Sequence, residues 1–230
     1  MLMYSCKKDN GDNIPEITFN PSISYGNMTD QDGHTYKTVA IGTQVWMAEN
    51  LKTTKYRNGD PITNVTDNIQ WKNLISGAYC NYDNNIQNTN IYGCLYNWFA
   101  VNDSRKIAPT GWHVPSDSEW KTLIDYLGGP YVSCDKLKET GTTHWNSSNS
   151  GATNESGFTA LPSGYRGKII FGGADLGYNF IYKGLFGIWW TSTDTLSIYA
   201  FERDLNTISV EVDWGYSTKD NGYSIRCVKD

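Results

Sequence analysis

Near the middle of the chain, apolar residues recur at the spacing that places side chains on one face of a helix. These i, i+3, i+4 and i+7 positions are Trp120, Leu123, Ile124 and Leu127. Ser116 followed three residues later by Glu119 matches a capping box, and Gly128-Gly129-Pro130 is a helix stop. The pattern predicts an amphipathic helix over about residues 117–127. A compact apolar run at residues 95–101 predicts a second, short and buried helix.

Alternation of apolar and polar residues predicts the strands. Residues 32–47 alternate on both sides of a Gly turn, which predicts a hairpin. Residues 189–193 read as a buried strand. Residues 199–205 and 208–212 alternate with period two around a tight turn at Asn206-Thr207, and residues 223–228 read as a strand that closes the sheet.

Two stretches show no period and are predicted to be loops. Residues 79–90 are rich in Asn and read as a long surface loop, and residues 144–187 are rich in Gly, Ser, Thr and Asn. Strands, two helices, a loop region and further strands follow one another along the chain. This order predicts an α+β domain in which two short helices pack on antiparallel strands with long irregular loops.

Aromatic residues are the unusual part of the composition, since 14% of the 230 residues are Phe, Trp or Tyr. Trp112, Trp120 and one ring of the tandem Trp189-Trp190 pair are predicted to fill the core, because consecutive strand residues point to opposite faces. Two glycines, Gly157 and Gly164, are expected at unusual backbone dihedrals. Two arginines, Arg166 and Arg226, are expected to pair inside the protein with Glu155 or Asp117.

The charge pattern excludes some classes of protein. The formal net charge is -5 and the sequence has no block of Lys or Arg, so the basic surface that nucleic acids require is missing. No segment approaches the roughly 20 consecutive apolar residues of a membrane-spanning helix. We therefore expect neither a nucleic-acid partner nor a transmembrane protein.

The N-terminus predicts export. Residues 2–5 lead into Cys6 in a pattern that resembles the end of a bacterial lipobox, whose upstream signal sequence is cut short here. Cys6 is the expected lipidation site, and the polar residues that follow read as a tether. Residues 1–28 are thus predicted to be a lipobox remnant and flexible tether, and residues 29–230 the folded domain. Four further cysteines, Cys80, Cys94, Cys134 and Cys227, allow three disulfide pairings or remain as free buried thiols.

Six ordered motifs resemble one known family. They are YGCLYNW (92–98), GWHVPSDSEW (111–120), GATNESGF (151–158), LPSGYR (161–166), GIWWTST (187–193) and SIRCV (224–228). In this order they resemble the Fibrobacter succinogenes major paralogous domain family over about residues 30–230. The resemblance implies an exported, often lipid-anchored bacterial surface protein of uncharacterised function. It also implies a fold similar to C-type lectins and to the formylglycine-generating sulfatase-modifying domain.

Catalytic chemistry finds little support in the residues. The histidines His34, His113 and His144 stand in no ligand spacing, and His113 reads as a structural imidazole. The reactive cysteine pair of the sulfatase-modifying relatives has no matching motif here, and the sugar-binding triplets of calcium-dependent lectins are missing. No cofactor is predicted. A structural calcium remains possible, with Asp83, Asn154, Glu155 and Asp175 as candidate ligands.

Recognition is the activity that the residues favour. Aromatic and amide side chains on Gly-rich loops stack on sugar faces and equally suit protein epitopes. In lectin-like folds the long loops and late strands form the ligand surface, and the C-terminal segment also resembles the variable region of lectin-fold proteins diversified by retroelements. The candidate ligand-binding residues are Tyr178, Tyr182, Phe186, Tyr199, Arg203, Trp214 and Tyr216.

We therefore expect a non-catalytic binding module for glycan or protein ligands. It is expected on an exported lipoprotein of the outer membrane, exposed at the cell surface and attached to the membrane through its lipid alone. Two alternatives stay open: an enzyme that acts on surface polysaccharide or protein, and a structural subunit of a surface assembly.

Overall fold

Antiparallel strands make up most of the regular structure. The computed structural model describes residues 15–146, 149–195 and 197–230. The strands are β1 (Gly26–Thr29), β2 (Thr35–Ile41), β3 (Gln44–Met47), β4 (Thr63–Asn64), β5 (Ala78–Cys80), β6 (Leu95–Tyr96), β7 (Trp112–His113), β8 (Tyr165–Phe171), β9 (Ala174–Ile181), β10 (Phe186–Asp194), β11 (Tyr199–Asn206), β12 (Asp213–Thr218) and β13 (Val228–Lys229). The helices are α1 (Asn68–Lys72), α2 (Ile86–Tyr92), α3 (Trp98–Val101), α4 (Asp117–Tyr126) and α5 (Pro130–Leu137), with a 3-10 turn η1 (Tyr82–Asn84).

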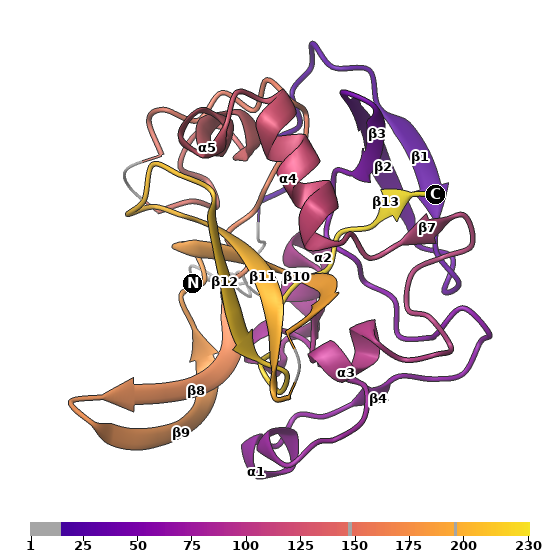
Figure 1. Cartoon of the computed structure of the whole chain (residues 1–230), viewed down its shortest axis with the longest axis vertical. Coiled ribbons are helices and arrows are strands. Elements are labelled where there is room, and N and C mark those ends of the chain that lie inside the picture. Colours follow the sequence, from indigo (N-terminus) through magenta and orange to yellow (C-terminus); the bar gives the residue numbers. More distant parts are fainter. Residues whose placement is uncertain (1–14, 147–148, 196) are drawn as a thin grey trace, which may run out of the picture.

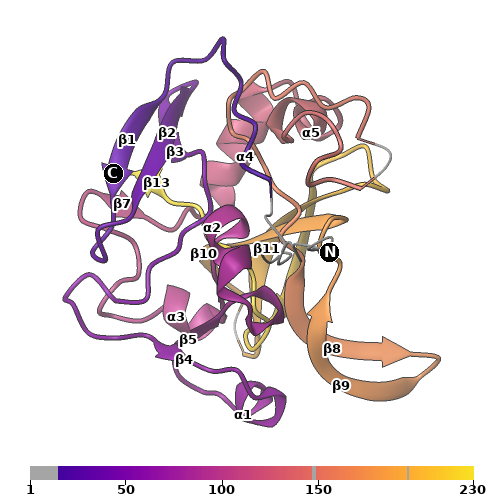
Figure 2. The same ribbon diagram turned by 180° about the vertical axis from the view of Figure 1, so that it is seen from behind.

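The strands form two main sheets and two smaller units. The larger sheet has the order β1-β2-β3-β13-β7, so the last strand of the chain lies between strands from its first half. The second main sheet has the order β10-β11-β12. A third, smaller sheet has the order β4-β5-β6. Strands β8 and β9 form a hairpin that extends away from the body of the molecule (Figure 1). Helix α4 faces the viewer in Figure 1 and α2 does so in Figure 2, so these helices lie on opposite sides of the molecule.

Helix α4 begins where the sequence predicts. The Ser116 hydroxyl accepts a hydrogen bond from the Glu119 N–H, and the Glu119 carboxylate accepts one from the Ser116 N–H at 2.7 Å. This capping box satisfies backbone groups that would otherwise lack partners at the helix start. The buried face of α4 carries Trp120, Leu123 and Ile124, and it packs in one apolar cluster with residues of β3, β10 and β13. The helix therefore joins the two main sheets.

The tandem tryptophans of β10 both belong to the core. Trp189 packs in the cluster of α4, and Trp190 packs on the opposite side of the strand with Tyr223. Both side chains are fully buried, where the sequence predicted one. Trp112 and Trp120 are buried as predicted. Each face of β10 is thus covered by apolar side chains, so β10 lies between the two main apolar clusters of the core.

Arg166 and Arg226, both fully buried, bind carbonyl groups instead of the carboxylates that the sequence suggested. Arg226 donates to Asn50 Oδ1 at 2.8 Å and to the carbonyls of Phe158 and Thr159. Arg166 donates to the carbonyls of residues 65 and 66 and to an amide oxygen of residue 68. The predicted pairing with Glu155 or Asp117 is wrong, because irregular loops bring bare carbonyls to the interior, and a planar guanidinium can satisfy several of them at once.

Gly157 and Gly164 have φ of 73° and 61°, as expected. At Gly164 a Cβ would lie 2.5 Å from the carbonyl oxygen of Ile181, so the loop approaches the hairpin too closely for a side chain.

The predicted loops contain regular structure. Residues 79–90 hold part of β5, η1 and most of α2, whose first turn is capped by the Asn85 side chain. Residues 144–187 hold the β8–β9 hairpin, whose turn residues Gly172 and Gly173 both have positive φ. Asn and Gly residues, which are typical of loops, here cap a helix and close a hairpin.

The helices number five in the described residues instead of the two predicted. α1 and α3 span only 5 and 4 residues, too few to show an apolar period, and each begins after an Asp or Asn cap. The run predicted as one helix at residues 95–101 divides at Asn97, where β6 ends and α3 is capped.

Two C-terminal strands differ from the prediction. Residues 208–212 are not a strand, because the Asn206 side chain accepts hydrogen bonds from the N–H groups of Ile208 and Ser209 and holds the chain in a longer turn. Strand β12 starts at Asp213 instead. Of residues 223–228 only the last belongs to β13, and Tyr223 and Ser224 make isolated bridges to Tyr96 and Trp189.

Cys80, Cys94, Cys134 and Cys227 are free and buried. Burial raises the pKa of the Cys80 and Cys94 thiols to about 12, so both stay protonated at neutral pH. In the part of the chain described here, no helix has the length and apolar character needed to cross a membrane.

Replacement of the buried Arg226 by Met should destabilise the fold. The change leaves the carbonyls of Phe158 and Thr159 without a donor and removes one of the two donors to Asn50 Oδ1. We expect the free energy of unfolding to fall by about 3 kcal/mol or more. Urea denaturation followed by tryptophan fluorescence measures this loss. Arg105→Met is the control, because Arg105 lies at the surface beside Asp103, and it should unfold close to the wild-type midpoint. Equal midpoints for the two variants would contradict the assigned role of Arg226.

Candidate functional site

Four aromatic side chains lie on one face of strands β11 and β12. They are Tyr199 and Phe201 of β11 and Trp214 and Tyr216 of β12, called here the aromatic face. Alternate strand residues point to the same side, and the register pairs Phe201 with Tyr216 and Arg203 with Trp214. Local alternation within each strand and the pairing of the two strands together produce the aromatic face.

The rings of the aromatic face contact one another but remain open to solvent. Tyr199 and Tyr216 meet edge to face with centroids 5.7 Å apart, and Phe201 and Trp214 lie 6.3 Å apart. Trp214 and Tyr216 keep 63% and 62% of their surface exposed. Large rings exposed side by side on an ordered strand are typical of a binding surface.

A groove of about 480 Å³ runs between the aromatic face and helix α4. Its lining combines apolar and charged side chains: Asp117, Lys121, Ile124, Asp125, Pro130, Phe201, Arg203, Val212 and Trp214. Arg203 Nε and Nη2 both donate to Asp117 Oδ1, at 3.0 and 2.5 Å, and Arg203 is buried. The ion pair fixes a carboxylate and a guanidinium beside the Trp214 ring, where hydroxyl groups of a ligand could bond to them.

The seven ligand-binding residues predicted from the sequence separate into two groups. Tyr199, Arg203, Trp214 and Tyr216 lie together at the aromatic face and its groove. The other three lie elsewhere: the Tyr178 hydroxyl on β9 donates to Asp220, and Tyr182 stacks on Phe186 with ring centroids 5.0 Å apart. Sequence reasoning missed Phe201, although it alternates with Tyr199 and Arg203, and it missed the contribution of α4, which only the tertiary fold reveals.

The reverse side of the same strands carries three carboxyl groups. Asp204 and Asp213 are cross-strand partners, and the Asn206 amide donates to both, at 2.9 and 3.4 Å. Glu202 is buried under Gly215, and its Oε2 has no hydrogen-bond partner among the described residues. Burial, and then the charge of Asp204, raises the pKa of Glu202 to about 8, and burial raises that of Asp204 to about 6. Glu202 is therefore mostly protonated at neutral pH.

The candidate calcium ligands Asn154, Glu155 and Asp175 each bond to a different partner. Asn154 bonds to Thr159, Glu155 pairs with Lys136 and Asp175 with Lys168, while Asp83 lies in η1. Within the described ranges, no group of three or more His, Cys, Asp or Glu residues is arranged to hold a metal ion.

The histidines are held by carboxylates. His113 contacts Asp230 and Glu119, each at 2.7 Å, so neither ring nitrogen is free to act as a base. His144 is buried between Glu139 and the carbonyl of Pro15, at 2.7 and 2.9 Å. His34 contacts Asp30 at 3.1 Å.

Glu202 should make stability depend on pH. Between its ordinary pKa of 4.5 and its folded value of about 8, the folded state keeps a proton that the unfolded chain releases, so stability falls as pH rises. Glu202→Gln stays neutral, so its stability relative to wild type should rise by about 3 to 4 kcal/mol between about pH 5 and about pH 8. Urea denaturation at several pH values measures this difference. The exposed Glu155→Gln is the control and should follow the wild-type curve, whereas a wild-type slope in Glu202→Gln would refute the assignment.

Comparison with known proteins places the chain in a family without supplying a function. No curated protein and no solved structure shows a significant match. The sequence model described as the Fibrobacter succinogenes major domain matches residues 39–229, which span most of the chain from β2 to β13 and include the aromatic face and its groove. The protein belongs to the Fibrobacter succinogenes major domain family.

Proposed function

We propose that the protein is a non-catalytic module that binds a glycan along the aromatic face and its groove. The observation that carries this proposal is the pair of exposed rings, Trp214 and Tyr216, at alternate positions of β12 beside the Arg203–Asp117 ion pair. Strand β12 lies at an edge of its sheet, so no further strand of this sheet blocks a long ligand that extends past it.

Aromatic rings and fixed charged pairs suit sugars for different reasons. The C–H groups on one side of a pyranose ring form an apolar face that packs on an indole or phenol ring, and its hydroxyls need donors and acceptors in fixed positions. Trp214 supplies the ring, and Asp117 and Arg203 supply the polar atoms at the groove floor. Because the ion pair is formed without ligand, the charged side chains lose little conformational entropy on binding.

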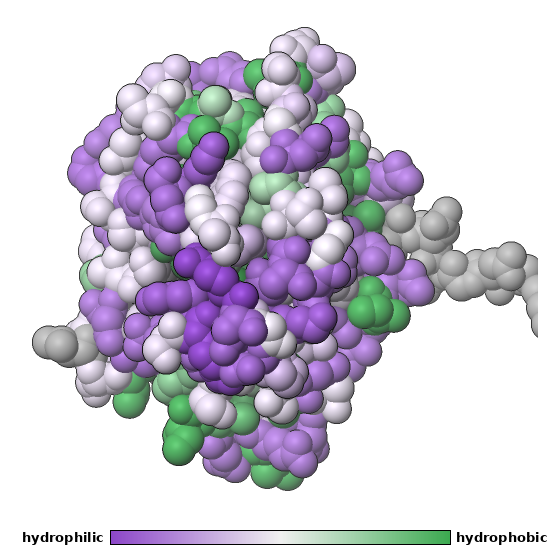
Figure 3. All heavy atoms as spheres, turned by 90° about the vertical axis from the view of Figure 1, so that its right-hand side faces the viewer, coloured by the Kyte–Doolittle hydropathy of each residue, from purple (hydrophilic) through white to green (hydrophobic). Residues whose placement is uncertain are grey.

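The proposal extends to fold and location. We propose that the mixed arrangement of helices and curled antiparallel sheets belongs to the C-type lectin-like class, and that the domain is displayed at the cell surface by a lipid on Cys6, which lies outside the described residues. The side of the domain that faces right in Figure 1 is mainly hydrophilic with scattered apolar residues (Figure 3), in keeping with a domain exposed to water.

A binding role is better supported than catalysis by the position of the carboxyl groups. Glu202, whose raised pKa is of the kind found in catalytic acids, lies on the reverse side of β11 from the groove and is covered by β12. Asp117 and Asp125, which do line the groove, are paired with Arg203 and Lys121.

Trp214→Ala should weaken glycan binding without unfolding the protein. The full chain would be run by affinity electrophoresis in gels that contain xylan, mannan, laminarin, pectin or a bacterial capsular polysaccharide. We expect at least one of them to retard the wild type, and Trp214→Ala to lose about tenfold or more in affinity because a stacking contact is worth about 1–3 kcal/mol.

Tyr126→Ala is the matched control, since Tyr126 is an exposed ring on α4 that packs toward Gly42, away from the aromatic face. It should bind as the wild type does. Retardation of Trp214→Ala equal to that of the wild type, or no retardation by any polysaccharide, would count against the proposal.

A further inference from the structure

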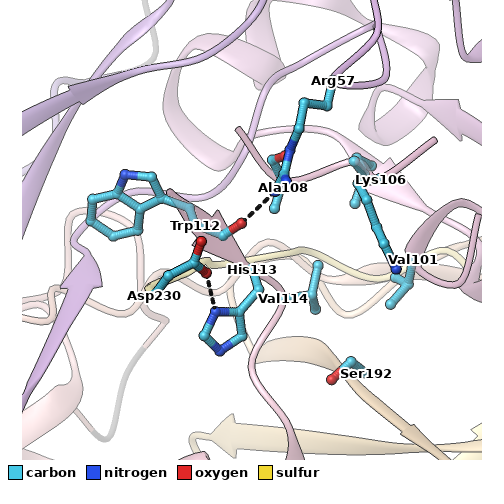
Figure 4. A pocket seen from close by; sticks show the side chains of 10 residues that line it. Arg57, Val101, Lys106, Ala108, Trp112, His113, Val114, Ser192 and Asp230 are labelled. Atoms are coloured by element: carbon cyan, nitrogen blue, oxygen red, sulfur yellow. Dashed lines mark hydrogen bonds and ion pairs between the residues drawn. The ribbon is translucent and has the colours of Figure 1, made fainter. Parts of the chain in front are cut away.

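A second pocket, of about 280 Å³, lies beside β7 and is separate from the aromatic face. Val101, Ile107, Ala108, Trp112 and Val114 give it an apolar wall, and its polar lining is Arg57, Lys106, His113, Ser192 and Asp230. Figure 4 shows Arg57 and Lys106 along one side of the pocket and His113 and Ser192 along the other. Basic groups therefore outnumber the single acidic group in the lining.

Arg57 is held in place without a carboxylate partner. Its Nε donates to the carbonyl of Ala108 at 2.9 Å, and its Nη2 donates to the carbonyls of Pro109 and Trp112 at 2.9 and 2.7 Å. Carbonyl groups orient a guanidinium but do not neutralise it. In the described part of the chain Arg57 forms no ion pair, and the two N–H groups of Nη1 have no acceptor.

Lys106 adds a second unpaired cation in an uncommon backbone conformation. Its φ is 60°, in the left-handed region that residues other than Gly and Asn rarely adopt. The turn is fixed because the Lys106 N–H donates to the carbonyl of Asp103 and the Lys106 carbonyl accepts from the Arg57 N–H at 2.7 Å. Asp103 itself is bound by Arg105, at 2.8 Å, which leaves the Lys106 ammonium without a partner among the described residues.

His113 adds no net positive charge to the lining, because it is paired with carboxylates. Partial burial opposes its protonation, but the hydrogen bonds to Asp230 and Glu119 outweigh burial and raise the pKa of the imidazole. The positive charge of His113 is thus balanced by its two carboxylates, while those of Arg57 and Lys106 are not balanced by any group in the pocket.

We propose that this pocket binds a carboxylate or sulfate group of a small ligand, whose apolar part lies against Trp112 and Val114. The free N–H groups of Arg57 and Lys106 are the donors for the anion, and the Ser192 hydroxyl is within the same lining. The ligand could be a free organic acid or the charged sugar of a polysaccharide, since both present the same anionic group. The site does not depend on the aromatic face, which lies on other strands.

Titration of the full chain with benzoate, followed by the indole N–H resonance of Trp112 in NMR spectra, tests the proposal. We expect saturable binding of benzoate, and binding about tenfold weaker or none for the neutral isostere benzamide. Methyl glucuronide and methyl sulfate are titrated in parallel. Tighter binding of the glucuronide than of benzoate assigns a charged sugar, and the reverse order assigns a free organic acid.

Lys106→Asn is the decisive variant because Asn tolerates the positive φ and removes the charge. It should weaken benzoate binding about tenfold and leave the unfolding midpoint unchanged, while the control Lys168→Asn, on the β8–β9 hairpin, should bind as the wild type does. Trp214→Ala should also bind benzoate normally, so failure here and failure of the glycan proposal are distinguishable. Equal binding of benzamide and benzoate, or wild-type affinity in Lys106→Asn, would overturn the inference.

Discussion

The structure depends most on the buried side chain of Asn50, which joins distant parts of the chain. Its Oδ1 accepts hydrogen bonds from Trp189 Nε1 at 2.9 Å and from Arg226 Nε at 2.8 Å, and its Nδ2 donates to the carbonyl of Tyr92 at 2.8 Å. Both polar atoms of this fully buried amide are hydrogen-bonded, and an unpaired polar group in the interior is costly. Asn50 thereby connects β10, the C-terminal segment and α2, and it allows Trp189 and Arg226 to be buried together.

This interior leaves the outer strands free for recognition. Strand β10 has apolar clusters on both faces, so its side chains cannot reach a ligand except near its ends. β11 shares its inner residues with those clusters but exposes Tyr199, and β12, which pairs only with β11 in its sheet, exposes Trp214 and Tyr216. The exposure of the side chains thus rises from β10 through β11 to β12. Because β10 is packed on both faces, it supports β11 and β12 rigidly and keeps their binding groups preorganised.

Local signals could be predicted from the sequence, and contacts between distant segments could not. Helix α4 carries its period, cap and stop within residues 116–130, so the prediction was confirmed, as was the β2–β3 hairpin around its Gly turn. The hairpin of β8 and β9 was missed because its Gly-Gly turn looked like part of a loop. Part of the candidate site could be predicted, since Trp214 and Tyr216 alternate along the chain. The groove could not be predicted, because Asp117 and Arg203 lie 86 residues apart and their pairing appears only in the fold.

Glycine at position 215 follows from the buried acid on the reverse side. A Cβ at Gly215 would lie 2.6 Å from Glu202 Oε1, so a larger residue there would force the Glu202 carboxyl out of its buried position. Trp214 and Tyr216 flank this position, and their separation from Phe201 and Tyr199 is set by how closely the two strands pair. A protonated Glu202 carries no charge to repel Asp204 and Asp213 across the same pair of strands. The neutral form of Glu202 is therefore compatible with the close pairing of β11 and β12, and this pairing places the aromatic rings side by side on the other face.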